Sequence, residues 1–203
     1  MVTFPVDVDL RGREALVVGD GPEVWPKIDR LIEAGARVTV LAEGDPGPEL
    51  LERASRMTLL VREATDADLA GKAIVFAAPF TTPAGEARAR RWHARAAAEG
   101  TLFCAIDRPE VCTFINAALV RAPGITMTFR TGGASPGAAR RIREDLEALF
   151  ADPRLGRFMH RLSALRASLP RGERAPRMAE AVRGFAVEAR LRFPAWFERD
   201  DAP

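Results

Sequence analysis

Five short apolar runs, separated by segments with helical periodicity, occupy the first half of the chain, and this alternation constrains the fold more than any other feature. The apolar runs span residues 14–19, 37–43, 57–63, 72–79 and 101–106. Helical patterns lie between them at about 27–34, 48–55 and 84–100. Strands that are apolar throughout and separated by helices are typical of a parallel sheet covered on both faces. Since crossovers between parallel strands are right-handed, we expect an α/β chain with a Rossmann-like parallel sheet.

The pattern changes after the fifth run. Residues 112–120 are of mixed character, 124–131 predict a strand, and 135–150 predict a helix with Ser135 as its N-cap. A strand and a helix cannot bury a core of their own, so we expect them to pack on a partner, such as a second copy. From Asp152 onward the chain is mainly helical and rich in arginine. The sequence therefore predicts a Rossmann domain (1–113), a dimerisation strand–helix region (114–150) and a small C-terminal helical module (151–203).

The composition excludes several classes of protein. With 47% hydrophobic and 29% charged residues, the chain is globular rather than disordered. A net charge of +2 is too small to indicate a nucleic-acid partner. No apolar run approaches the roughly 20 residues of a membrane span, and the N-terminus lacks a signal-peptide pattern. Cys104 and Cys112 lie in or near a predicted buried strand, so we expect no disulfide framework and a cytoplasmic location.

The stretch VVGDGPEVW, residues 17–25, looks like an incomplete dinucleotide-binding fingerprint. Gly19 and Gly21 permit a tight turn and close approach to a pyrophosphate, which the N-terminus of the following helix favours. Pro22 fits the first turn of a helix. However, Val24 stands where a third small residue is expected. The loop predicts a nucleotide site, and the alternative is a relic that no longer binds one.

Glu43 ends the second apolar run, where a carboxylate can hydrogen-bond a ribose hydroxyl. Such an acid favours NAD over NADP because it repels the 2′-phosphate, so NAD is the expected cofactor. The expected cofactor-binding residues follow the first, second and fourth runs: Gly19, Asp20, Gly21, Pro22, Glu23, Glu43, Gly44, Ala78 and Pro79.

Asp107 directly follows the fifth run, which places it at the carboxyl edge of the predicted sheet, where such folds bind ligands. The alternative is a loop carboxylate that caps the next turn, before Pro109. Further on, Gly132 and Gly133 precede the Ser135 cap and form an N–H-rich turn suited to anions.

Two compositional features bear on ligands. The chain has 28 arginines and two lysines, a bias typical either of a GC-rich genome or of proteins that bind carboxylates and phosphates. No pair of histidines or cysteines has the spacing of metal ligands, so we expect no metal site in the protein.

Together these segments resemble the precorrin-2 dehydrogenase/sirohydrochlorin ferrochelatase family, the N-terminal half of siroheme synthases, over roughly residues 3–150. The resemblance rests on FPVDVDLRGREALVVGDG, KIDRLIEAGARVTVLA and AIDRPEVCTFINAALV, and most specifically on RTGGASPGAARRIREDLE. The chain departs from the family pattern near the nucleotide site, at AAPFTTP after the fourth run and at Cys104, where the family has Asn.

The resemblance implies a homodimeric enzyme that oxidises precorrin-2, a tetrapyrrole bearing many carboxylates, to sirohydrochlorin with NAD+, and that in some members inserts Fe2+. It implies that Asp107 is the general base or proton acceptor. It also implies that the substrate's carboxylates are bound by Arg130, Thr131, Gly132, Gly133 and Ser135. Two alternatives stay open: a tetrapyrrole chelatase without NAD chemistry, and a dimer that binds a nucleotide or tetrapyrrole without turnover.

Overall fold

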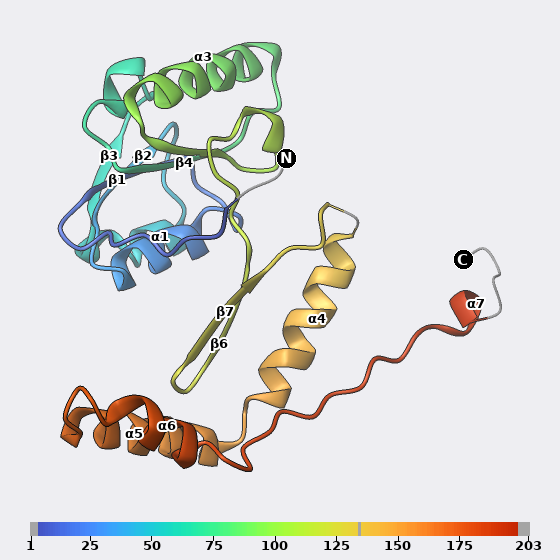
Figure 1. Cartoon of the computed structure of the whole chain (residues 1–203). Coiled ribbons are helices and arrows are strands. Elements are labelled where there is room, and N and C mark those ends of the chain that lie inside the picture. The colour runs from blue at the N-terminus through green and yellow to red at the C-terminus, as the bar shows by residue number, and fades with distance from the viewer. Residues whose placement is uncertain (1–3, 134, 199–203) are drawn as a thin grey trace. The chain divides into compact units, whose positions relative to one another are not determined.

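The computed structural model describes residues 4–133 and 135–198 (Figure 1). The chain divides into two compact units, residues 1–116 and 117–203. The division falls slightly beyond the predicted end of the Rossmann domain at residue 113. Every element of the predicted parallel sheet lies in the first unit.

A five-stranded sheet forms the centre of the first unit. All neighbouring strands are parallel, in the order β3-β2-β1-β4-β5. This is the doubly wound arrangement that the alternating sequence pattern predicts, and the predicted fold class is confirmed. The strands are β1 Glu14–Val18, β2 Arg37–Ala42, β3 Thr58–Val61, β4 Ile74–Ala77 and β5 Leu102–Ala105.

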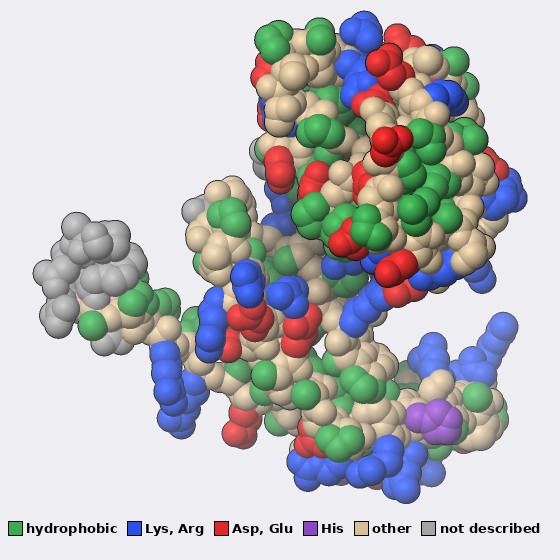
Figure 2. Space-filling view, turned by 180° about the vertical axis from the view of Figure 1, so that it is seen from behind, with side chains coloured by type: hydrophobic (Ala, Val, Ile, Leu, Met, Phe, Trp, Pro, Cys, Tyr) green, Lys and Arg blue, Asp and Glu red, His purple; other side chains and the backbone are tan. Residues whose placement is uncertain are grey.

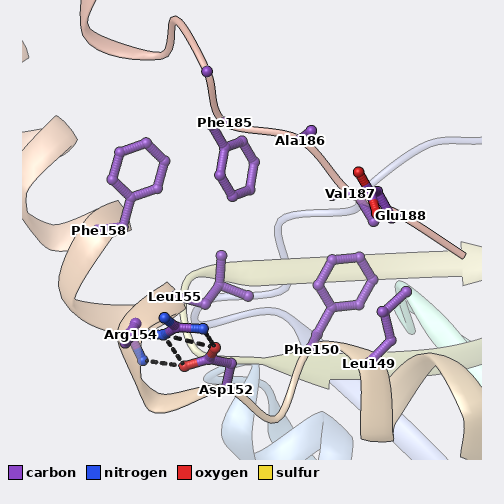
Figure 3. A pocket seen from close by; sticks show the side chains of 11 residues that line it. Leu149, Phe150, Asp152, Arg154, Leu155, Phe158, Phe185, Ala186, Val187 and Glu188 are labelled. Atoms are coloured by element: carbon purple, nitrogen blue, oxygen red, sulfur yellow. Dashed lines mark hydrogen bonds and ion pairs between the residues drawn. The ribbon is translucent and has the colours of Figure 1, made fainter.

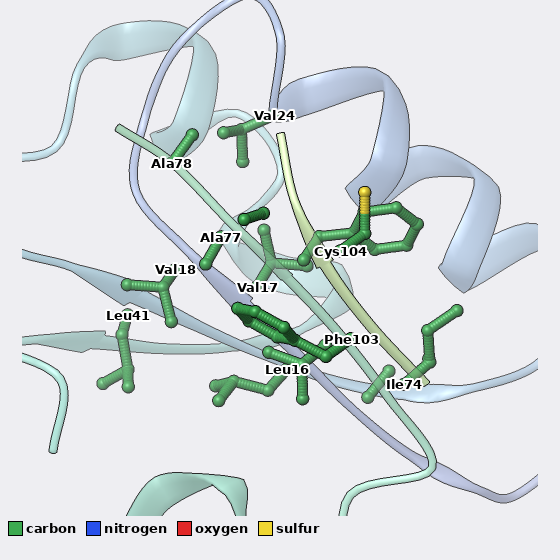
Figure 4. Close-up of a cluster of buried hydrophobic side chains, with 14 of the residues drawn as sticks. Leu16, Val17, Val18, Val24, Leu41, Ile74, Ala77, Ala78, Phe103 and Cys104 are labelled. Carbon is green, nitrogen blue, oxygen red and sulfur yellow. The ribbon is translucent and has the colours of Figure 1, made fainter. Parts of the chain in front are cut away.

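Helices cover both faces of this sheet (Figure 1), with α1 on one face and α3 on the other. The helices are α1 Trp25–Glu33, α2 Pro48–Leu51 and α3 Pro83–Glu99, with 3-10 turns η1 Ala54–Arg56, η2 Asp66–Leu69 and η3 Pro109–Val111. The core between the layers is aliphatic and aromatic (Figure 4), and Leu16, Trp92 and Phe103 are among its fully buried side chains. Because the central strands are buried on both faces, their sequences are apolar throughout rather than alternating.

The register of the sheet brings four loops to one edge. Val18 pairs with Leu41 on one side and with Ala77 on the other, and Ala77 pairs in turn with Ala105. The residues that follow these strand ends therefore lie along the carboxyl edge of the sheet, where doubly wound folds bind their ligands.

The second unit begins with an antiparallel hairpin of β6 (Ala118–Ala122) and β7 (Ile125–Phe129). The sequence predicted only the second strand; β6 pairs with it across a tight Pro123–Gly124 turn, a partner that local composition does not reveal. The helices are α4 Pro136–Leu149, α5 Pro153–Ser168, α6 Arg174–Ala181 and α7 Ala195–Glu198. As predicted, Ser135 caps α4: its side chain accepts a hydrogen bond from the Ala138 N–H at 3.1 Å. Within the described residues, no helix is both long and apolar enough to cross a membrane.

Candidate functional site

A tight turn at the end of β5 presents Asp107. The Arg108 N–H donates to the Ala105 carbonyl at 3.0 Å and closes the turn. Asp107 has φ +64, and it is the only non-glycine residue with positive φ among the described residues. Asp and Asn adopt this left-handed conformation more readily than most residues, since their short polar side chains fit it. Asp107 therefore lies at the sheet edge, in the position that the sequence predicted for it.

The Asp107 carboxylate has no partner of its own. It is exposed, and within the described residues it makes no hydrogen bond or ion pair. The N-cap position of η3 is filled by Arg108 without a side-chain hydrogen bond. The alternative that Asp107 caps the next turn is therefore wrong, and its carboxylate is available to a ligand.

Asp107 lines a pocket of about 240 Å³ in the first unit. Polar or reactive side chains reach this pocket from α1, β5 and the loop after η3: Lys27, Cys104, Cys112 and Asn116. Burial lowers the pKa of Lys27, and Arg30 adds to this effect. Lys27 was not among the predicted site residues, although it is one of only two lysines in an arginine-rich chain.

The thiol of Cys112 holds the Asp107 turn. Its Sγ donates to the carbonyls of Ala105 and Arg108, which flank the turn on either side, at 3.3 Å each. Cys112 is only 2% exposed and its neighbour Cys104 7% exposed; both are free thiols. The interaction with Cys112, together with burial, raises the pKa of the Cys104 thiol. The sequence placed both cysteines in or near a buried strand but did not reveal this supporting role of Cys112.

Arg108 ties the same turn to the neighbouring strand end. Its guanidinium donates to the Phe80 carbonyl at 3.1 Å and to the Glu86 carboxylate at 3.0 Å. A second acid, Glu110, accepts from its Nε at 2.8 Å. The turn is thus attached both to the loop after β4 and to α3, so the position of Asp107 depends on contacts far apart in the sequence.

The glycine loop after β1 makes the close backbone approach that its sequence predicts. Gly19 has φ +112, and a Cβ there would lie 2.0 Å from the Ala78 carbonyl oxygen. Ala78 is followed by a cis peptide bond to the exposed Pro79. Val24 is fully buried and belongs to the cluster of buried side chains drawn in Figure 4. The Val24 side chain, which is larger than the residue expected in the dinucleotide-binding fingerprint, thus packs in the hydrophobic core.

Some polar groups of this loop have hydrogen-bond partners within the protein, and others have none among the described residues. The Asp20 carboxylate accepts from the Trp25 Nε1 at 2.6 Å and from the Gly47 N–H at 2.7 Å, so its charge is engaged within the protein. The N–H groups of Gly21 and Glu23 have no acceptor among the described residues. The Glu23 carboxylate folds back over Gly21, 2.9 Å from where a Cβ would lie. The loop therefore offers donors that suit a pyrophosphate, provided that the Glu23 side chain swings away.

Glu43 lies at the end of β2 as predicted, but it is already paired. Its carboxylate accepts from both terminal nitrogens of Arg88, at 2.5 and 2.9 Å, and from the Ala64 N–H at 2.9 Å. Burial would raise the pKa of Glu43, but the hydrogen bonds from Arg88 and Ala64 outweigh it and lower the pKa. At Gly44, the next residue, no atom lies within 4 Å of the position that a Cβ would occupy, so the space beside it is open. Arg88 was missed because α3 is far from β2 in the sequence.

The residues predicted to bind substrate carboxylates belong to the second unit. Gly132 and Gly133 both have positive φ, at +66 and +86, in the connection from β7 to α4. Thr131 donates from its hydroxyl to the Ser135 carbonyl at 3.5 Å. Arg130 is exposed just before this connection. Gly132 and Gly133 thus lie in the left-handed backbone region, between the end of a strand and a helix that Ser135 caps.

The arginines of the second unit fall into two groups. Those on α4 make ion pairs one turn apart, Arg140–Glu144, Arg141–Asp145 and Arg143–Glu147. Such exposed surface pairs contribute little to stability. Basic side chains also gather over the part of this unit that holds α5 and α6 (Figure 2).

The second unit also contains a cavity of about 440 Å³ at the junction of α4 and α5 (Figure 3). Its lining is mainly apolar, and the rings of Phe158 and Phe185 lie 4.9 Å apart at their centroids. The polar part of the lining includes Asp152, whose carboxylate is ion-paired with Arg154. None of the predicted site residues lines this cavity.

No group of three or more His, Cys, Asp or Glu side chains that could hold a metal ion occurs within residues 4–133 and 135–198. The candidate site of the first unit combines an open carboxylate, a half-buried lysine and a glycine loop along one sheet edge.

Comparison with known proteins also indicates a nucleotide-binding domain in the first unit. Residues 6–118 match a family model described as "Putative NAD(P)-binding". A siroheme synthase of Gluconacetobacter diazotrophicus is 34% identical over 152 residues, which cover 72% of this chain and 32% of that protein. One of Nitrosococcus oceani is 33% identical over 165 residues, covering 79% and 34%. The chain thus spans about a third of the length of these relatives.

Among solved structures, SirC, a precorrin-2 dehydrogenase, is similar with a TM-score of 0.71 and 20% identity, and the match covers 89% of each chain. At this identity the likeness shows a shared fold. The family match and the relatives confirm the resemblance that the sequence predicted, and the solved structure confirms the fold class. The NAD(P)-binding description of the family supports the prediction of NAD as cofactor.

Proposed function

Because the chain belongs to the NAD(P)-binding family that its residues 6–118 match, we propose that it oxidises precorrin-2 to sirohydrochlorin with NAD+. The siroheme synthases and the precorrin-2 dehydrogenase to which it is similar support this choice of substrate. The observation that carries the proposal is the exposed, unpartnered carboxylate of Asp107, on a turn that Cys112 and Arg108 hold in place.

The dinucleotide would be held along the carboxyl edge of the sheet. The loop from Gly19 to Glu23 provides backbone N–H groups for the pyrophosphate, and Glu43 with Gly44 follows the strand that usually meets the adenosine ribose. Ala78 and Pro79 follow the neighbouring strand, β4. When bound, NAD+ supplies the hydride acceptor.

Asp107 takes the proton. Loss of a hydride from a reduced tetrapyrrole is accompanied by loss of a proton, so the overall change converts precorrin-2 and NAD+ to sirohydrochlorin, NADH and H+. An ionised carboxylate can accept that proton at one of its oxygens and pass it to water, which exposure of Asp107 permits. Lys27 lines the same pocket and offers a positive charge to a carboxylate of the substrate.

In a homodimer, the turn before α4 in the second unit would bind carboxylates of the substrate. Arg130 supplies a guanidinium, and the Thr131–Gly133 turn with Ser135 supplies backbone and hydroxyl groups near it. Arginine suits this task because its planar donors match a carboxylate.

A second function, insertion of Fe2+ into sirohydrochlorin, is favoured by one observation. The Glu23 carboxylate lies over Gly21, where it opposes a pyrophosphate. Metal insertion needs no dinucleotide, but it does need a base to remove the pyrrole protons, a task that the free Asp107 carboxylate can perform.

The test is anaerobic turnover of enzymatically generated precorrin-2, followed by the absorbance of sirohydrochlorin. Product that depends on NAD+ supports the dehydrogenase. Absence of product from folded protein, with iron incorporated when sirohydrochlorin and Fe2+ are supplied, would replace it with the chelatase. Absence of both activities, with retained tetrapyrrole binding, would indicate a binding protein.

A further inference from the structure

The ion pair between Glu43 and Arg88 occupies the position that normally decides between NAD and NADP. In doubly wound folds, an acid at the end of the second strand hydrogen-bonds the adenosine ribose, and a nearby arginine accommodates a 2′-phosphate. This chain has both groups at once, and they are hydrogen-bonded to each other at 2.5 and 2.9 Å.

The guanidinium of Arg88 is fixed in place by more than its acid partner. It lies over the ring of Trp92, 5.1 Å from the centroid, and over that of Phe80, at 5.7 Å. Both rings are buried, at 0% and 4% exposure. Because the cation is stacked on aromatic side chains of its own and the adjacent segment, it stays beside Glu43 without depending on a bound ligand.

The pair leaves donors available on the cation. An arginine has five N–H groups. One on each terminal nitrogen donates to Glu43, and the Nε–H is buried without an acceptor. The second hydrogen of each terminal nitrogen has no acceptor among the described residues, and the Arg88 side chain is 21% exposed. The cation is thus partly open to solvent at the end of β2.

The charge at this position is therefore balanced. A lone carboxylate would repel the 2′-phosphate of NADP, as the sequence had suggested for Glu43. With Arg88 attached, the repulsion is offset by an equal positive charge a few ångströms away. The remaining N–H groups can in addition donate to a phosphate oxygen.

We propose that Arg88 sets the dinucleotide selectivity of this site, so that the chain accepts a 2′-phosphorylated dinucleotide as well as NAD. The inference rests on the proposed function only in requiring that the glycine loop binds a dinucleotide. It makes Arg88 a specificity-determining residue contributed by α3 rather than by the loop after β2.

The test is to measure dissociation constants for NAD+ and NADP+ by isothermal titration calorimetry on the full chain. For the unaltered protein we expect the two constants to agree within about tenfold. Arg88→Ala removes the cation beside the Glu43 carboxylate, so it should weaken the binding of NADP+ relative to that of NAD+ by a further factor of at least about 10. Glu43→Gln removes the negative charge, so it should strengthen the binding of NADP+ relative to that of NAD+. The folding of both variants is first checked by circular dichroism and melting temperature. If Arg88→Ala does not fold, Glu43→Gln still tests the inference, because it keeps Arg88 and its aromatic stacking.

Arg91→Ala is the matched control. Arg91 lies on the same helix and pairs with Asp66 at 3.6 Å, so its removal changes the net charge equally without touching Glu43. It should leave the NADP+/NAD+ ratio within about twofold of the unaltered value.

The outcomes separate this inference from the proposed function. NAD+ binding with strong exclusion of NADP+, unchanged by Arg88→Ala and Glu43→Gln, would overturn the inference and leave the dehydrogenase standing. Binding of neither dinucleotide by the folded protein would overturn both. If Arg91→Ala changed the NADP+/NAD+ ratio as much as Arg88→Ala did, the effect would come from net charge alone, and the role of Arg88 would be overturned.

Discussion

At the scale of single residues, the conformation of Asp107 allows its chemical role to be tested apart from its backbone role. Asn is comparably tolerant of the left-handed region, so Asp107→Asn keeps the turn and removes only the ionisable oxygen. We expect this variant to lose dehydrogenation by at least about 100-fold, the usual contribution of a general base. The measurement is the rate of sirohydrochlorin formation, with the NAD+ dissociation constant determined in parallel.

The affinity for NAD+ should stay within about twofold, because no predicted cofactor contact involves Asp107. Asp107→Gly serves as control for the backbone, since glycine adopts positive φ without strain; it should be folded and equally inactive. Retained turnover in Asp107→Asn would remove the carboxylate from the mechanism.

Cys112 offers a second prediction at this scale. Its S–H donates to the two carbonyls that flank the Asp107 turn, so removal of the donor should loosen the turn without changing the pocket's charge. A lost hydrogen bond of about 1 kcal/mol corresponds to roughly a fivefold effect. We expect Cys112→Ala to lower kcat by about that factor with little change in the KM for NAD+, and Cys112→Ser to restore most of it.

Cys104→Ala is the companion variant, since Cys104 lines the same pocket and donates to neither carbonyl. If Cys104→Ala and Cys112→Ala reduced kcat equally, the effect would come from packing in the pocket, and the role of the Cys112 thiol in holding the turn would be discarded.

At the scale of elements, the junction between β1 and β4 determines whether the glycine loop can form. A Cβ at residue 19 would meet the Ala78 carbonyl oxygen at 2.0 Å, and the positive φ adds strain. Gly19→Ala should therefore lower stability by about 3 kcal/mol or more. Thermal unfolding and urea titration measure this effect in the absence of any nucleotide.

Gly44→Ala is the matched change at the other loop of the same site. Nothing lies within 4 Å of the Cβ it would add, and its φ is not in the left-handed region. We expect unchanged stability, and a weakened NAD+ affinity only if the cofactor passes close to residue 44. Equal destabilisation by both substitutions would contradict the close-packing explanation for Gly19.

The elements of the first unit were predictable because their strands are buried on both faces and their helices have clear boundaries. Each of the five strands lies within its predicted apolar run. Helix α3 begins at Pro83 and ends just before Gly100, and these residue types favour such positions. The strand β6 was missed because its pairing depends on the neighbouring strand rather than on its own composition. The positions of Gly19, Glu43 and Asp107 could be predicted because each follows the end of a strand. The roles of Lys27 and Arg88 could not, because they arise from contacts between elements distant in the sequence.

At the scale of the whole molecule, the chain divides after Asn116, and the first unit has a core of its own. We predict that residues 1–116 alone are a folded monomer that binds NAD+ with an affinity close to that of the full chain. The full chain should be a dimer, because the second unit leaves large apolar side chains about half exposed: Ile142 on α4, and Phe185 and Phe193 in the segment between α6 and α7. Light scattering coupled to size-exclusion chromatography measures both masses.

A dimeric 1–116 fragment would place the interface in the first unit, and a monomeric full chain would rule out the dimerisation region. The fragment's circular dichroism and NAD+ titration distinguish a folded monomer from an unfolded one. A folded fragment that fails to bind NAD+ would show that the second unit contributes to the cofactor site.

The contact between Gly19 and the Ala78 carbonyl has a consequence for how such chains change over evolutionary time. Selection for folding alone preserves a glycine at this position, whether or not any member of the lineage still uses a dinucleotide. A descendant can therefore lose its redox chemistry and still carry the first glycine of the fingerprint. Drift after such a loss would first be seen at sites where side chains fit without strain, of which Gly44 is the example in this chain.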